Sequence, residues 1–134
     1  MLVTMSRFDH AETMRRLADA VAHRALTVFG LIDHAHGARQ VGLELHPEEV
    51  LVFGNPRAGT GLMQADPRIG IELPLRVLVW AVADAVHIAY NDPRELAGRY
   101  DLDAAHATLD AMSELLAAVV AEAAGAPPPA GVAG

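Results

Sequence analysis

Four apolar runs, each about as long as a β-strand, lie between two longer segments with helical periodicity. The runs cover residues 26–32, 50–53, 75–83 and 86–90. In the flanking segments apolar residues recur every three or four positions, as on the buried side of an amphipathic helix. Strand-length runs enclosed by amphipathic helices predict an α+β fold, in which helices cover one mainly antiparallel sheet.

The two outer helices carry start and stop signals. Short polar side chains accept hydrogen bonds from the unpaired N–H groups of a first helical turn. We therefore expect Ser6 or Asp9 to cap the first helix, and Asp101 or Asp103 to cap the last. Gly125 is expected to end the last helix, because glycine readily adopts the left-handed conformation.

Shorter elements are expected between these helices. The run 26–32 predicts a buried strand, which Asp33 ends before a short helix over about 35–41. Residues 54–61 predict a loop that opens a helix over 62–64, and Asp84-Ala85 predicts a hairpin turn. Another short helix is expected to start at Asn91-Asp92-Pro93, since proline is tolerated in a first helical turn.

The length and composition predict one domain. The 134 residues, of which 52% are hydrophobic, suffice for a core that needs no disulfide or metal. We expect this domain to span residues 1–125. Residues 126–134, rich in proline, alanine and glycine, are expected to form a disordered tail.

Charge and composition exclude several classes of chemistry. The net charge is −7, so a basic surface for nucleic-acid binding is not expected. All cations are arginine, which excludes a Schiff-base lysine, and the lack of cysteine excludes thiol catalysis and disulfides. The longest apolar run, 77–83, is far shorter than the roughly 20 residues of a spanning helix. Without a signal-peptide-like start, we expect a cytoplasmic protein that does not enter a membrane.

Asp33 and His34 are the first candidates for chemistry. A carboxylate next to an imidazole at the end of a strand suits general acid–base catalysis. The alternative is structural: Asp33 caps the next helix and His34 packs or forms hydrogen bonds. A metal site with His36 is also conceivable, but two histidines at this spacing are a weak signal, and no metal or other cofactor is expected.

The glycine-rich stretch 54–61 is the second candidate. Its glycine spacing resembles a nucleotide-binding P-loop, but Thr60 occupies the position of the required lysine, and Pro56 removes a backbone donor. A P-loop is therefore excluded. Arg57, Thr60 and free N–H groups at a helix start suit a carboxylate or another small anion. Alternatively, Asn55 and the glycines only form a tight connection between strand and helix.

Arg76 is unusual because it lies within an apolar strand. Alternation places it on the same side as Leu78 and Trp80. There it can line a ligand cleft, together with Tyr90 at the end of the next strand, or extend to solvent at the sheet edge.

Several ordered motifs resemble one known family. They are Val28-Phe29-Gly30-Leu31-Ile32-Asp33-His34-Ala35, Phe53-Gly54-Asn55-Pro56-Arg57-Ala58-Gly59-Thr60, Leu62-Met63-Gln64, the stretch 72–80, and Tyr90-Asn91-Asp92-Pro93. Together, over residues 10 to 120, they resemble the bacterial and archaeal "domain of unknown function 302" family. The resemblance implies a β-α-β sandwich of the TATA-binding-protein-like kind, often dimeric, with no established activity. Asp84-Ala85 and His87 depart from the family's usual pattern, and both departures lie at the expected hairpin.

Three functional hypotheses follow. The first is a domain that binds a small ligand, including an anionic one, through Asn55, Arg57, Thr60, Arg76 and Tyr90, with Asp33 and His34 nearby. The second is an enzyme that uses Asp33 and His34 as general acid and base. The third is a homodimer with a structural role, which would cover an exposed apolar sheet face.

Overall fold

The computed structural model describes residues 1–102 and 104–126. Its elements, in chain order, are β1 (Leu2–Met5), α1 (His10–Ala22), β2 (Thr27–Asp33), α2 (His34–Gln40), β3 (Glu48–Gly54), α3 (Pro56–Ala65), the 3₁₀ helix η1 (Pro67–Glu72), β4 (Leu75–Val82), β5 (Ala85–Tyr90), the 3₁₀ helix η2 (Pro93–Gly98) and α4 (His106–Ala124). The predicted α+β class is confirmed.

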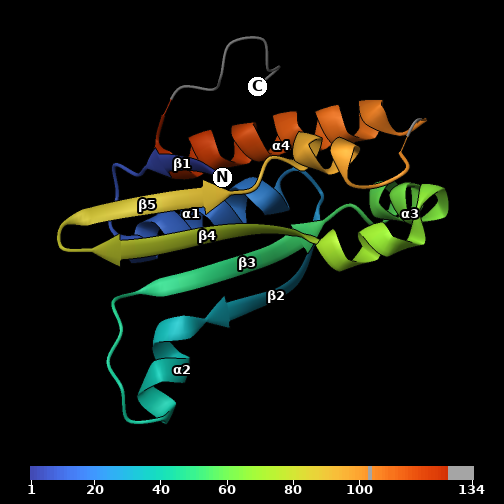
Figure 1. Ribbon diagram of the computed structural model, residues 1–134. Coiled ribbons are helices and arrows are strands. Elements are labelled where there is room, and N and C mark those ends of the chain that lie inside the picture. The colour runs from blue at the N-terminus through green and yellow to red at the C-terminus, as the bar shows by residue number, and fades with distance from the viewer. Residues whose placement is uncertain (103, 127–134) are drawn as a thin grey trace.

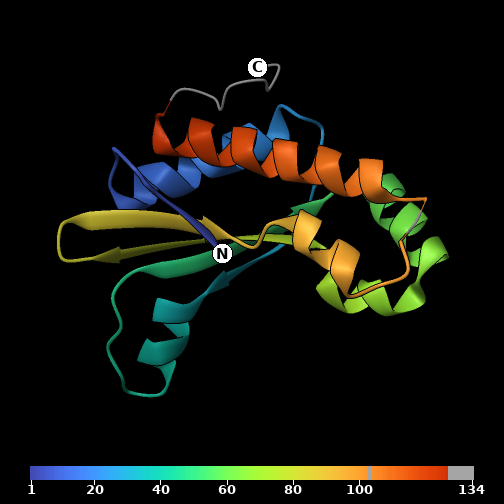
Figure 2. The same ribbon diagram turned by 45° about the horizontal axis from the view of Figure 1, so that its top comes forward.

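Within the described residues the strands form one five-stranded sheet in the order β1-β5-β4-β3-β2. Every neighbouring pair is antiparallel. The two long helices, α1 and α4, cover one side of this sheet, whereas α2 lies on the other side next to β2 (Figures 1 and 2). One side of the sheet therefore has a helical layer, and the other is largely without one.

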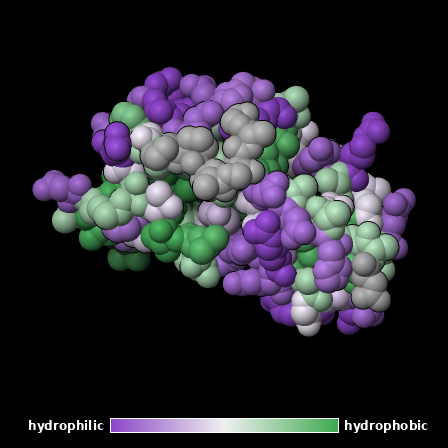
Figure 3. All heavy atoms as spheres, turned by 90° about the horizontal axis from the view of Figure 1, so that it is seen from above, coloured by the Kyte–Doolittle hydropathy of each residue, from purple (hydrophilic) through white to green (hydrophobic). Residues whose placement is uncertain are grey.

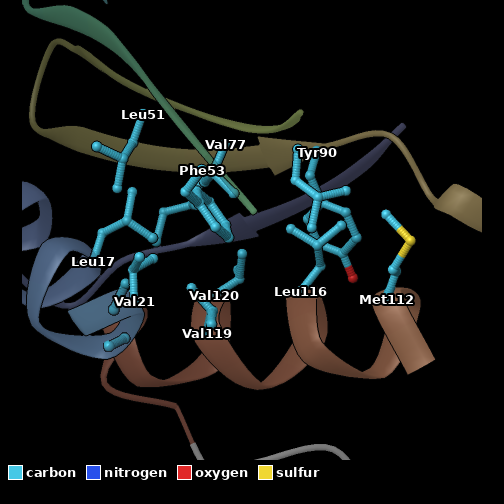
Figure 4. Close-up of a cluster of buried hydrophobic side chains, with 14 of the residues drawn as sticks. Leu17, Val21, Leu51, Phe53, Val77, Tyr90, Met112, Leu116, Val119 and Val120 are labelled. Carbon is cyan, nitrogen blue, oxygen red and sulfur yellow. The ribbon is translucent and has the colours of Figure 1, made fainter. Parts of the chain in front are cut away.

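The hydrophobic core lies between the sheet and the α1/α4 layer. In Figure 4 side chains of both helices point towards side chains of β3, β4 and β5. Phe53 of β3, Val77 of β4 and Leu17 of α1 are fully buried. This arrangement follows from the sequence pattern, because alternate strand residues and every third or fourth helix residue face the same apolar layer.

Helix ends match the expected signals only in part. Asp9 caps α1, with its carboxylate accepting a hydrogen bond from the backbone N–H of Glu12 at 2.8 Å. Gly125 ends α4 in the left-handed conformation, as predicted. The N-cap of α4 is Ala105, which has no side-chain capping bond. The predicted cap Asp101 therefore lies before the helix, and Asp103 lies outside the described residues.

One strand was not expected, and two local expectations were wrong. Residues 2–5 form the edge strand β1, which the sequence did not suggest because the segment is short and gains its hydrogen bonds only from β5. The helix α3 begins at Pro56 rather than near Leu62, since Asn55 caps it and proline suits its first turn. The hairpin turn consists of Ala83 and Asp84, with Val82 opposite Ala85.

The strand β2 also differs from expectation, because it is exposed rather than buried. Phe29 and Leu31 are 53% and 54% exposed. β2 is an edge strand, and the helical layer does not extend over it (Figure 1). A strand-length apolar run thus indicated the element correctly but not its burial.

Figure 3 looks onto the helical side, where hydrophilic residues cover much of the surface and hydrophobic ones gather mainly towards the left. Within the described residues, no helix combines the length and the hydrophobicity that crossing a membrane requires. The predicted tail lies almost entirely outside the described residues.

Candidate functional site

The sequence-predicted site residues do not form one cluster. In the antiparallel pair of β2 and β3, Asp33 lies opposite Glu49 at the start of β3, whereas Asn55 follows the end of β3. Six residues of extended strand separate the two ends, which is about 20 Å. Asp33 and His34 therefore lie at one end of the β2/β3 pair, and Asn55 lies at the opposite end.

Asp33 has a structural task in this fold. Its Oδ1 accepts a hydrogen bond from the backbone N–H of His36 at 2.9 Å and so caps α2. Asp33 and His34 are both exposed, and neither lines a pocket described below. Among residues 1–102 and 104–126, no group of three or more histidine, aspartate or glutamate side chains is arranged to hold a metal ion.

A pocket lies at the other end of β3. Its volume is about 650 Å³. Its walls are formed by the first turns of α3, the end of η1 and the first half of α4, and Phe29 of β2 forms a further side. This size falls within the usual range of small-molecule sites. We call it the α3–α4 pocket.

The lining of the α3–α4 pocket is mainly apolar. Small residues such as Gly59 and Ala111 leave the space open, whereas Phe29, Met63 and Met112 supply large apolar surfaces. The polar side chains are Asn55, Thr60 and Thr108. No charged side chain of the described residues lines it, so its chemistry suits an uncharged or largely apolar molecule with one or two hydrogen-bonding groups.

The five predicted ligand-binding residues are divided between two hollows. Asn55 and Thr60 line the α3–α4 pocket, whereas Arg76 and Tyr90 line a second hollow of about 220 Å³. Arg57 is exposed in the first turn of α3 and lines neither. Burial is the main cause that raises the pKa of the Tyr90 hydroxyl, with a smaller contribution from the carboxylate of Asp92.

Asn55 shapes the wall of the larger pocket. Its side-chain oxygen accepts a hydrogen bond from the backbone N–H of Arg57 at 3.0 Å. That oxygen is therefore occupied by the helix cap, which was the alternative to a ligand role for Asn55. Its position on the lining leaves the rest of the side chain next to the pocket.

Asp66 fixes the chain between α3 and η1, both of which line the pocket. Its buried carboxylate accepts hydrogen bonds from the Arg68 guanidinium at 2.8 and 3.1 Å, and from the backbone N–H of Asp101 at 3.0 Å. The hydrogen bonds from the Arg68 side chain, followed by the one from Asp101, hold the pKa of this carboxyl well below its ordinary value.

We expect acid to weaken the fold through Asp66. A carboxyl group with a lowered native pKa stabilises the folded state above its unfolded pKa, and this contribution is lost as the pH falls towards the native pKa. Asp66→Asn should therefore flatten the decline in the free energy of unfolding below about pH 4. Urea denaturation at a series of pH values measures this slope.

Asp110→Asn is the matched control, because Asp110 is an exposed carboxylate that also contacts an arginine, Arg94, at 2.8 Å. Its removal should change the slope much less than Asp66→Asn does, since solvent screens exposed ion pairs. Identical acid slopes for the wild type and Asp66→Asn would contradict the assignment.

The sequence missed several residues of the pocket. Phe29 belongs to one of the motifs that resemble the family, but it was not connected to a ligand, and Met112 was not a candidate either. The jump in register from Val28↔Phe53 to Gly30↔Val52 leaves Phe29 as the extra residue of a β-bulge. Bulges redirect a side chain. The remaining sequence signal was the stretch 56–65, which is rich in glycine and alanine and forms α3.

Comparison with known proteins places this arrangement in context. The family described as "Domain of unknown function DUF302" matches residues 2–119. The crystal structure of an uncharacterized conserved DUF302 protein from Bacillus stearothermophilus superimposes with a TM-score of 0.82, covering 91% of this chain and 96% of that one. The identity is 19%, so this likeness concerns the fold.

Two curated relatives are similar in sequence over a shorter segment. They are Fluoride-specific ion channel FluC 1 of Brucella suis biovar 1 and the protein of the same name from Brucella abortus biovar 1. Each is 44% identical to this chain over 103 residues. The matched segment covers 75% of this chain but only 41% and 38% of those proteins. The chain thus spans about two fifths of the length of these relatives.

Proposed function

We propose, on the premise that this chain belongs to the DUF302 family of unknown function, that the chain binds a small, largely apolar molecule in the α3–α4 pocket. The observation that carries the proposal is a pocket of about 650 Å³ with apolar walls and three uncharged polar side chains. Burial of the ligand's apolar surface would supply most of the affinity, at roughly 25 cal/mol per Å².

The polar side chains would orient a ligand within the pocket. Thr60 of α3 and Thr108 of α4 lie on the lining from two different helices. Each hydroxyl can donate or accept a hydrogen bond, so a carbonyl or hydroxyl group of the ligand would find partners there. An anionic ligand is disfavoured in this pocket, because no cation lines it among the described residues.

Two related fluorescent probes test this proposal. N-Phenyl-1-naphthylamine is uncharged, and 8-anilino-1-naphthalenesulfonate has a similar ring system with an added sulfonate. We expect the neutral probe to bind at least tenfold more tightly to the wild type. Ala111→Phe, which adds a ring to the pocket wall, should weaken that binding at least tenfold without lowering the melting temperature appreciably.

Ala18→Phe is the matched control, because it adds the same ring at an exposed position of α1 that lines neither pocket. It should leave probe binding unchanged. Equal affinities for Ala111→Phe and the wild type would exclude the α3–α4 pocket as the site. Native mass spectrometry of freshly purified protein would then identify a co-purified ligand directly.

We also propose that the chain forms a homodimer, as the family resemblance implies. The specific support is the side of the sheet away from α1 and α4, which is largely without a helical layer (Figures 1 and 2) and exposes about half of Ile32 and Val3 at its two edges. The enzymatic alternative receives less support, since Asp33 and His34 are exposed and line neither hollow. Their catalytic role stays a prediction, which activity assays of His34→Ala would test once a substrate is found.

A further inference from the structure

The side of the sheet that faces away from α1 and α4 carries a row of apolar residues. The cross-strand partners in this row are Ile32, Val50, Leu78, Ala89 and Val3, one from each strand. At the two edges, Ile32 and Val3 are 49% and 51% exposed, whereas Val50 and Leu78 are half-buried and Ala89 is buried. We call this side the open face; α2 lies on the same side and bounds it at the β2 edge (Figure 2).

Two further rows flank the apolar row, and their charges differ in sign. In one, Glu48, Trp80 and His87 are cross-strand neighbours, and the rings of Trp80 and His87 stack with centroids 5.0 Å apart. In the other, Arg76 lies opposite Val52. Each row is two residues along the strand from the apolar row, which is about 7 Å.

The two charged groups also differ in whether they have an ionic partner. The Oε1 of Glu48 lies 2.7 Å from the Nε2 of His46. Arg76 is exposed and makes no ion pair with any residue that the structure describes. The open face therefore presents an acidic group on one side of the apolar row and a cation on the other.

We infer that a second copy of this chain packs on the open face, with the two-fold axis in the plane of the interface and perpendicular to the strands. This inference rests on the proposed homodimer and assigns its surface. Rotation about this axis exchanges the two flanking rows, so Arg76 of one copy faces the row with Trp80 and Glu48 of the other. The apolar rows then meet each other at the centre.

Charge favours the in-plane axis perpendicular to the strands over the one parallel to them. An axis parallel to the strands would place Arg76 of each copy at the same height on the central strand β4, so the two cations would face each other. Like charges in direct opposition are destabilising. The perpendicular axis instead brings each arginine within reach of a carboxylate one strand away, since neighbouring strands are about 4.8 Å apart.

The test is a charge exchange read by analytical ultracentrifugation over a range of protein concentrations. We expect a dimeric wild type, and at least tenfold weaker dimerisation in Arg76→Glu and in Glu48→Arg. The double variant, which exchanges the charges, should restore the dimer to within about threefold of the wild type. Arg57→Glu is the matched control, since this exposed arginine lies on α3 away from the open face, and it should not change dimerisation.

Each outcome has a distinct meaning. A dimer that neither single variant weakens would overturn the open face as its interface but leave the homodimer itself intact. A wild type that stays monomeric throughout would overturn the homodimer as well. Single variants that weaken the dimer without rescue in the double variant would contradict the pairing of Arg76 with Glu48. Binding of the neutral probe is measured separately, so the ligand proposal stands or fails independently.

Discussion

Phe53→Ala should lower the free energy of unfolding by about 3–5 kcal/mol, the range for removing a buried aromatic ring from a core. Phe53 is fully buried in β3, opposite Leu75 of β4, and it points into the layer between the sheet and α4 (Figure 4). Its loss removes apolar contacts and leaves a cavity that close-packed neighbours fill only in part. Urea denaturation followed by circular dichroism measures the change.

Two further variants make this prediction specific. Phe53→Leu retains much of the volume and should cost clearly less, about 1–2 kcal/mol, which guards against an alanine variant that does not fold. Phe29→Ala removes the same ring from a position that is 53% exposed, and should cost about 1 kcal/mol. Equal losses for Phe29→Ala and Phe53→Ala would show that burial does not distinguish the two sites.

The same pair of residues shows how far the sequence could predict the fold. The apolar runs at 26–32 and 50–53 correctly indicated strands, because alternation and β-branched residues are local properties. Whether a strand is buried depends on what covers it. Phe53 lies under α4, whereas Phe29 lies on an edge strand that the helical layer does not cover. Neighbouring sequence contains no signal for this difference.

The candidate site was harder to predict than the fold. Asp33 ends β2 and Asn55 follows β3, and we expected the two residues to lie near one another. In an antiparallel pair, however, the carboxyl end of one strand lies beside the amino end of the other, as the pairing of Asp33 with Glu49 shows. The carboxyl ends of β2 and β3 therefore lie at opposite ends of the pair. The pocket lies instead between small residues of α3 and α4. The relative position of these two helices is set by tertiary packing, which no local motif encodes.

Gly125→Ala should destabilise the protein by about 2–5 kcal/mol, for two reasons that add. Gly125 ends α4 at φ +73°, a conformation that costs an L-residue about 1–2 kcal/mol. A Cβ there would also lie 2.6 Å from Cε2 of Phe8, and relieving such an overlap typically costs another 1–3 kcal/mol. The Arg16 guanidinium lies 4.2 Å above the centroid of the Phe8 ring, so the ring cannot shift towards Arg16.

Gly42→Ala separates the two contributions. Gly42 has φ +77°, and an added Cβ would meet no atom within 4 Å, so only the backbone cost of about 1–2 kcal/mol applies. In a Phe8→Ala background the overlap disappears, and Gly125→Ala should then cost no more than Gly42→Ala. If both glycine variants lose the same stability in the wild-type background, the overlap with Phe8 contributes nothing. A larger loss at Gly125 that Phe8→Ala relieves would establish that this ring holds the end of α4 against the start of α1.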